Sequence, residues 1–128
     1  VDALPSPVYG ADSRANERLL DAQFALNRRN VEGLGEALQN FEALAAQYPD
    51  IADAFIGIAE TNLLMREFAA VSDDVAYRRA GMAARRAVEI APNSPAALRA
   101  LGFVTFWGER RHADGLALLK RAVALAPG

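Results

Sequence analysis

The sequence contains no cysteine, and it has a single histidine and a single tryptophan among its 128 residues. Without cysteine the chain can form no disulfide, thiol nucleophile or thiolate metal site, and its redox compartment stays open. No run of apolar residues approaches the roughly 18 that a transmembrane helix needs, and we expect no signal peptide. We therefore expect this segment to make no membrane contact.

A basic excess is also lacking, because the chain carries 14 basic and 16 acidic residues. Binding to nucleic acid normally requires clustered positive charge, so we expect no direct contact with nucleic acid. Four arginine pairs occur: Arg28-Arg29, Arg78-Arg79, Arg85-Arg86 and Arg110-Arg111. They could form a basic stripe for an acidic partner, or a solvated outer face on which Arg85 or Arg86 pairs with Glu89. The overall acidic balance favours the second interpretation.

Groups that could carry out catalysis are few. His112 is the only histidine, and a zinc site or a Ser-His-Asp triad would need partners that the sequence does not supply. The adjacent carboxylates Asp73 and Asp74 fit the start of a helix, where the helix dipole favours negative charge, better than an acid–base pair. No phosphate-binding loop is present. We therefore expect neither an enzyme nor a bound cofactor or metal.

The abundant residues favour one helical domain. Apolar residues make up 52% of the chain, mostly alanine and leucine, and glycine and proline stand at apparent boundaries. Residues 1–12 have no helical period and two prolines, which indicates an extended lead-in or linker. We expect six helices after it: from Ser13 to about Asn27, from about Glu32 to Tyr48, from a cap at Asp50 past Met65, from about Ser72 to Pro92, from Ser94 to about Trp107, and from about Arg111 to Ala126.

One segment of the sequence is repeated along the chain. RRAVEIAPNS (residues 85–94) returns as KRAVALAPG (residues 120–128), with Pro127 lying 35 residues after Pro92. A looser copy, FEALAAQYPD, covers residues 41–50. A repeat of this length with two helices predicts a stack of helix pairs, each of which has too little core to stand alone. The pairs are expected at about 13–49, 50–92 and 93–128.

This pattern resembles the tetratricopeptide repeat (TPR), in which large and small residues recur at fixed positions of two helices and a proline follows. The third pair matches best, with Leu98, Leu101, Gly102, Gly115, Leu119, Ala122 and Pro127. The second pair contains an insertion of about nine residues around residues 66–77, and the first helix of the first pair matches poorly. The resemblance implies an all-α, right-handed solenoid of three antiparallel helix pairs.

A narrower resemblance is carried by LNRRNVEGLGEALQNFEALAAQYPDIADAFIGIAETNLL and ARRAVEIAPNSPAALRALGFVTFW. Both are similar to TPR regions of multidomain bacterial signalling proteins, either winged-helix transcriptional regulators or class III nucleotide cyclases. The resemblance implies a non-catalytic scaffold that binds a protein or peptide, in the cytoplasm or periplasm of a bacterium. We expect the chain to be a fragment of a longer protein.

The first helix of each pair would line the concave groove of such a solenoid. Projection of the repeat places eight residues there: Gln23, Asn27, Asp53, Ile56, Glu60, Arg99, Phe103 and Trp107. Phe103 and Trp107 are four residues apart and would form one aromatic surface with Arg99 a turn earlier, suited to a peptide or a helix. Alternatively, these aromatic residues pack against neighbouring helices or a fourth repeat.

The alternative function is self-association, in which two copies of the chain would form a homodimer. The last helix carries Leu116, Leu118 and Leu119, and the chain stops where another repeat or a polar capping helix would cover them. An uncovered apolar face at this end would favour pairing with another copy.

Overall fold

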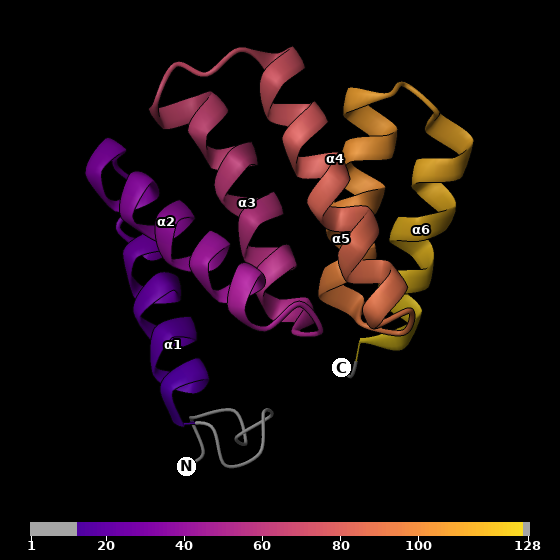
Figure 1. Ribbon diagram of the computed structural model, residues 1–128. Coiled ribbons are helices and arrows are strands. Elements are labelled where there is room, and N and C mark those ends of the chain that lie inside the picture. The colour runs from indigo at the N-terminus through magenta and orange to yellow at the C-terminus, as the bar shows by residue number, and fades with distance from the viewer. Residues whose placement is uncertain (1–12, 127–128) are drawn as a thin grey trace.

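The computed structural model describes residues 13–126 and is helical throughout its regular elements (Figure 1). The elements are α1 (Ser13–Asn27), α2 (Val31–Gln47), α3 (Ala52–Phe68), α4 (Asp73–Ile90), α5 (Pro95–Phe103), the π-helical segment η1 (Val104–Gly108) and α6 (His112–Leu125). The predicted all-α class is confirmed. The lead-in expected at residues 1–12 and the terminal Pro127-Gly128 lie outside the described residues.

Side-chain caps begin α2, α4 and α5, and the cap at Ser94 was predicted from the sequence. The hydroxyl of Ser94 accepts a hydrogen bond from the amide of Ala97 at 3.2 Å, and Ser72 caps α4 in the same way. The side chain of Asn30 accepts a 2.7 Å hydrogen bond from the Gly33 amide and caps α2. The predicted cap at Asp50 is wrong, because buried Ile51 occupies the cap position of α3 and makes no side-chain hydrogen bond there.

Two kinds of helix end alternate along the chain. Arg29, Ala70 and Arg110 follow α1, α3 and η1 with φ angles of 50°, 54° and 58°, in the left-handed region that closes many helices. In contrast, α2 and α4 end at Tyr48 and Ala91, whose φ angles are −130° and −132°. A proline follows each of these two residues and prevents the helix from continuing. Turns with a left-handed residue therefore follow α1, α3 and η1, and turns with a proline follow α2 and α4.

The helices form a row that runs from α1 and α2 at one end to α6 at the other (Figure 1). Each helix packs against the next one in the chain, and α3 also contacts both α1 and α5. The core is divided between the ends of this row. Large side chains, with Phe41, Leu34 and Leu44 fully buried, fill the space among α1, α2 and α3. Mostly alanine, together with Val104, fills the space among α3, α4, α5 and η1.

Glycines stand at close helix crossings, and Gly57 and Gly102 are two examples. A Cβ atom built on Gly57 of α3 would lie 2.3 Å from the ring of Phe41 in α2, and one on Gly102 of α5 would lie 2.8 Å from Leu119 in α6. Ala59 of α3 and Ala87 of α4 are also small residues, and both are fully buried. Close approach therefore depends on the absence or small size of side chains at these positions. None of the helices within residues 13–126 is long and apolar enough to cross a membrane.

Candidate functional site

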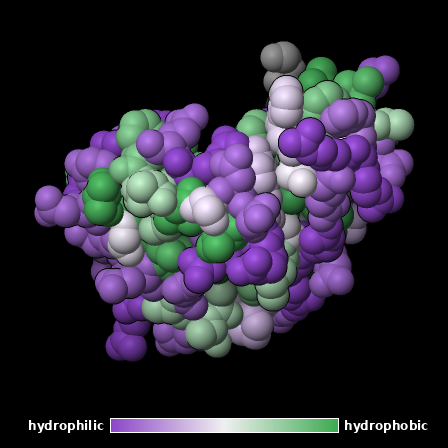
Figure 2. Space-filling view, turned by 90° about the horizontal axis from the view of Figure 1, so that it is seen from above, coloured by the Kyte–Doolittle hydropathy of each residue, from purple (hydrophilic) through white to green (hydrophobic). Residues whose placement is uncertain are grey.

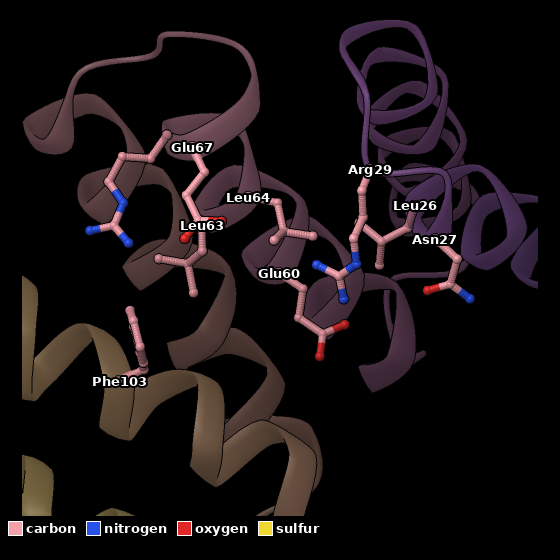
Figure 3. A pocket seen from close by; sticks show the side chains of 9 residues that line it. Leu26, Asn27, Arg29, Glu60, Leu63, Leu64, Glu67 and Phe103 are labelled. Atoms are coloured by element: carbon pink, nitrogen blue, oxygen red, sulfur yellow. The ribbon is translucent and has the colours of Figure 1, made fainter.

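The side of the row formed by α1, α3 and α5 contains a hollow of about 370 Å³. Seen from above, the surface is indented between the left part of the molecule, where Figure 1 places α1 to α3, and the right part, where it places α5 and α6 (Figure 2). The apolar walls come from three helices, through Leu26, Leu63, Leu64 and Phe103. Figure 3 shows Leu63 and Phe103 approaching each other from α3 and α5.

The acidic side chains of the hollow come from α3. Glu60 and Glu67 stand seven residues apart, with Leu63 and Leu64 between them, and this spacing puts all four on one face of the helix. Because α3 lies between α1 and α5 in the row, that face forms the middle of the hollow. The helical period of α3 therefore places charged and apolar side chains in turn along the face that borders the hollow.

The Glu60 carboxyl is held in a partly buried position. Burial raises the pKa of Glu60 above its ordinary value, Arg99 and Arg29 lower it, and repulsion from Asp53 raises it further. Burial outweighs the two arginines, so the pKa remains raised. Within residues 13–126, no cation lies within ion-pair distance of this carboxylate. The charge of Glu60 is therefore only partly compensated by the protein.

The two arginines of the hollow differ in what they contact. Arg66 donates a hydrogen bond to the hydroxyl of Tyr77, its guanidinium lies 4.8 Å from the ring centroid of Tyr77, and its Nε lies 3.9 Å from the Asp73 carboxylate. Arg66 is thus held against α4. Arg29 follows the end of α1, and its side chain points toward Glu60 in Figure 3. Of the two, Arg29 has no carboxylate within 4 Å among residues 13–126.

Three of the eight residues expected in the groove line this hollow, namely Asn27, Glu60 and Phe103. Asp53 and Arg99 lie outside it but close enough to change the pKa of Glu60. Arg99 also lines a second hollow of about 220 Å³ with Leu119 and other residues of α6. Gln23 is exposed on α1 and lines neither hollow.

Ile56 does not present its side chain to the groove. Only 7% of its surface is exposed, and it packs with Ala87 of α4 and Ala97 of α5. The projection assigned it to the groove because it stands one turn before Glu60. In the fold, that position faces the junction of three helices, so Ile56 belongs to the core.

Trp107 and Phe103 do not form the single aromatic surface that their spacing predicted. Phe103 stacks on Tyr77 of α4 with ring centroids 6.5 Å apart, whereas Trp107 meets Phe106 edge-on at 4.9 Å. The helix changes to π geometry at Val104, and the wider turn alters the direction of the residues that follow. Phe103 consequently lines the hollow, while Trp107 is 56% exposed outside it.

The three leucines considered for self-association do not share one face of α6. Leu116 and Leu119 line a shallow hollow of about 290 Å³ together with Lys120 and Val123, whereas half-buried Leu118 does not line it. Val123, which the sequence analysis did not single out, is 76% exposed. Its spacing of seven residues from Leu116 and four from Leu119 is the helical signal that could have identified it.

Six residues that line the hollow were not predicted from the sequence as groove residues: Leu26, Arg29, Leu63, Leu64, Arg66 and Glu67. Helical spacing of three, four and seven residues from Glu60 identifies Leu63, Leu64 and Glu67 of α3. Arg29 could not be found in this way, because it stands beyond the end of α1 and reaches the hollow through a left-handed turn.

No group of three or more His, Asp or Glu side chains is placed to hold a metal ion in residues 13–126. His112 is exposed at the start of α6, where its ring lies 4.7 Å from that of Phe106. Comparisons with family models, curated proteins and solved structures find no match to this chain.

Proposed function

We propose that the chain is a TPR-like scaffold that binds a protein or peptide in the hollow formed by α1, α3 and α5. In this proposal its helices form a right-handed solenoid of three antiparallel pairs, and the first helices of the pairs line the concave side. The alternation of two turn types and the contacts of α3 with both α1 and α5 support this arrangement. We propose that the chain belongs to a larger bacterial signalling protein, because its repeats resemble the TPR regions of such proteins.

The observation that carries the binding proposal is the position of Glu60 among apolar walls. The Glu60 carboxylate is partly removed from water, and its arginine neighbours compensate its charge only in part. The approach of another cation therefore stabilises it. The walls of Leu63, Leu64 and Phe103 offer apolar surface beside it. A lysine or arginine side chain fits both features, since its methylene stem packs on apolar groups while its charged end reaches the carboxylate.

The balance of charge in the hollow supports a basic ligand. Glu60 and Glu67 contribute two negative charges, and Arg29 contributes one positive charge. Arg66 adds little, because Asp73 compensates it from outside the hollow. With Arg66 engaged by Tyr77 and Asp73 of α4, the charged side chains left to meet a ligand in the hollow are Glu60, Glu67 and Arg29, which favours an extended or helical peptide with a basic side chain.

The test is a titration of the protein with the peptide acetyl-Ala-Ala-Arg-Ala-Ala-amide, followed by amide chemical shifts in NMR spectra. We expect shifts to concentrate at Glu60, Leu63 and Phe103, with a Kd on the order of 1 mM for so short a probe. The same peptide with citrulline in place of arginine keeps the shape and removes the charge. It should bind at least about tenfold more weakly.

Two variants complete this experiment. Glu60→Gln should abolish the arginine-specific shifts, whereas Glu42→Gln, which removes the same charge from an exposed position of α2, should leave them unchanged. Equal shifts with arginine and citrulline, or no shifts with either peptide at about ten times the expected Kd, would contradict the proposal.

A further inference from the structure

A repeated sequence makes α6 the counterpart of α4. The shift of 35 residues that aligns the two copies places Leu116, Leu119 and Val123 of α6 on Gly81, Ala84 and Val88 of α4. The structure confirms that both copies are helical over these residues. What covers this face of α4 can therefore be compared with what covers the same face of α6.

On α4 this face is covered by the following helix. Ala84 packs in one cluster with Ala100 of α5 and Val104 of η1, and a Cβ atom built on Gly81 would lie 3.2 Å from Val104. Val88 packs against a neighbouring cluster that includes Ala97 of α5. The face of α4 is thus the surface on which the next first-of-pair helix stacks.

On α6 the equivalent face is uncovered within residues 13–126. Leu116 is 44% exposed and Val123 is 76% exposed, and both border a hollow of about 290 Å³ with Leu119 and Lys120. Apolar side chains also gather at the upper right of Figure 2, toward the end of the row that α6 forms in Figure 1. This end of the molecule presents a stacking face larger in apolar surface than that of α4, because leucines replace glycine and alanine.

The other end of the row presents a complementary helix. Leu20 and Phe24 stand four residues apart on the exposed side of α1, and Phe24 is 72% exposed. Glu17 and Asp21 lie next to them on the same exposed side. α1 opens the first pair as α5 opens the third, so it is the kind of helix that covers such a face. Its acidic residues match the charge of Lys120 on α6.

We infer that α1 of a second copy of this chain docks on the α6 face formed by Leu116, Leu119, Lys120 and Val123. The contact continues, between two molecules, the stacking that joins α4 to α5 within one. The contact is heterologous, because it joins two different faces. A dimer therefore keeps a free α1 face at one end and a free α6 face at the other. The resulting assembly is an open head-to-tail chain. This inference is independent of the peptide site around Glu60.

The experiment measures mass by sedimentation equilibrium over a range of concentrations. We expect the unmutated chain to form dimers and longer species, with a dissociation constant on the order of 0.1 mM for one small interface. Phe24→Glu and Val123→Glu each damage one face and leave the other intact, so each variant alone should be a monomer. An equimolar mixture of the two should form a dimer that grows no further, since each copy supplies its one intact face.

Gln39→Glu introduces the same charge at an exposed position of α2 and should assemble like the unmutated chain. Far-UV circular dichroism checks that all variants keep their helices. A monomeric unmutated chain at ~1 mM would overturn the inference. So would a mixture that stays monomeric, or a dimer that only Val123→Glu disrupts, which would indicate symmetric pairing of α6 with α6.

Discussion

At the scale of single residues, the partly buried carboxylate of Glu60 destabilises the fold, and a bound cation would offset this effect. Burial raises the pKa of its carboxyl, and this means that the folded state holds the proton more tightly than the unfolded chain does. Any stability linked to that proton is present at low pH and is lost as the pH rises through the folded-state pKa. At neutral pH the ionised carboxylate therefore lowers the free energy of unfolding.

We predict that Glu60→Gln raises the free energy of unfolding at pH 7, because the amide carries no charge to be desolvated. The gain should shrink as the pH falls and vanish below the ordinary glutamate pKa of 4.5, where both states hold the proton. Urea unfolding at a series of pH values measures this. Glu42→Gln, at an exposed site, should change stability by less than about 0.5 kcal/mol. A variant that is less stable than the parent at pH 7 would contradict the prediction.

The same variant separates a binding role from a structural one. If Glu60 served mainly to hold α1, α3 and α5 together, its replacement would lower stability and binding together. We expect stability to rise while binding of the arginine peptide is lost. Opposite changes of this kind are typical of residues kept for function.

At the scale of helices, crossings decide which substitutions are tolerated. Gly57 lies against the ring of fully buried Phe41, so a methyl group added to α3 there has no space. Gly35 of α2 offers the opposite case, because a Cβ atom built on it meets nothing within 4 Å. Both glycines stand inside helices, where alanine is intrinsically favoured.

The two substitutions to alanine should therefore have opposite effects. Gly57→Ala is expected to lower the free energy of unfolding by about 1–3 kcal/mol, the range for overpacking a core. Gly35→Ala should raise it by up to about 1 kcal/mol through helix propensity. Chemical denaturation of both variants measures the difference. A stabilising Gly57→Ala would show that α2 and α3 are less tightly packed than the structure has them.

Most helix ends could be predicted from local chemistry, and the exceptions depend on packing. Ser72, Ser94 and the prolines act on residues next to them, so their effects are visible in the sequence. Asp50 was a plausible cap by the same logic, but burial of Ile51 moved the start of α3. The π turn at η1 was not predicted. At that turn Gly108 lies against Tyr77 of α4, and Phe106 lies against Gly115 of α6. Both contacts join residues from separate helices.

At the scale of the whole molecule, the core is uneven. Large side chains fill the space among α1, α2 and α3, whereas only Gly115 and Ala122 of α6 are buried. In a row of helices each element is stabilised chiefly by its neighbours, so the end with the smaller interface opens more often.

Hydrogen exchange tests this directly. In dilute protein, we predict that amides of α6 exchange at least about tenfold faster than those of α2 and α3. Head-to-tail association would cover α6, so higher protein concentration should slow exchange in α6 and α1 and leave α3 unchanged. Uniform protection along the row in dilute protein would contradict the predicted order.

The candidate site shows how far spacing alone can go. Asn27, Glu60 and Phe103 could be placed in the hollow because helical periodicity fixes which residues share a face. The same periodicity could not determine how far each helix is rotated against its neighbours. For that reason Ile56 was placed in the groove although it is core, and Trp107 was joined to Phe103 although its ring contacts Phe106.

The sequence by itself determined the helical class, most helix boundaries and the repeated segment, because these follow from local propensities, caps, prolines and an internal likeness. Only the tertiary structure decided which faces are covered. It placed Arg29 beside Glu60, left Leu116 and Val123 of α6 exposed in the described part of the chain, and turned the helix after Val104. These outcomes arise from packing between segments that are distant along the chain, and no local pattern encodes the geometry of that packing.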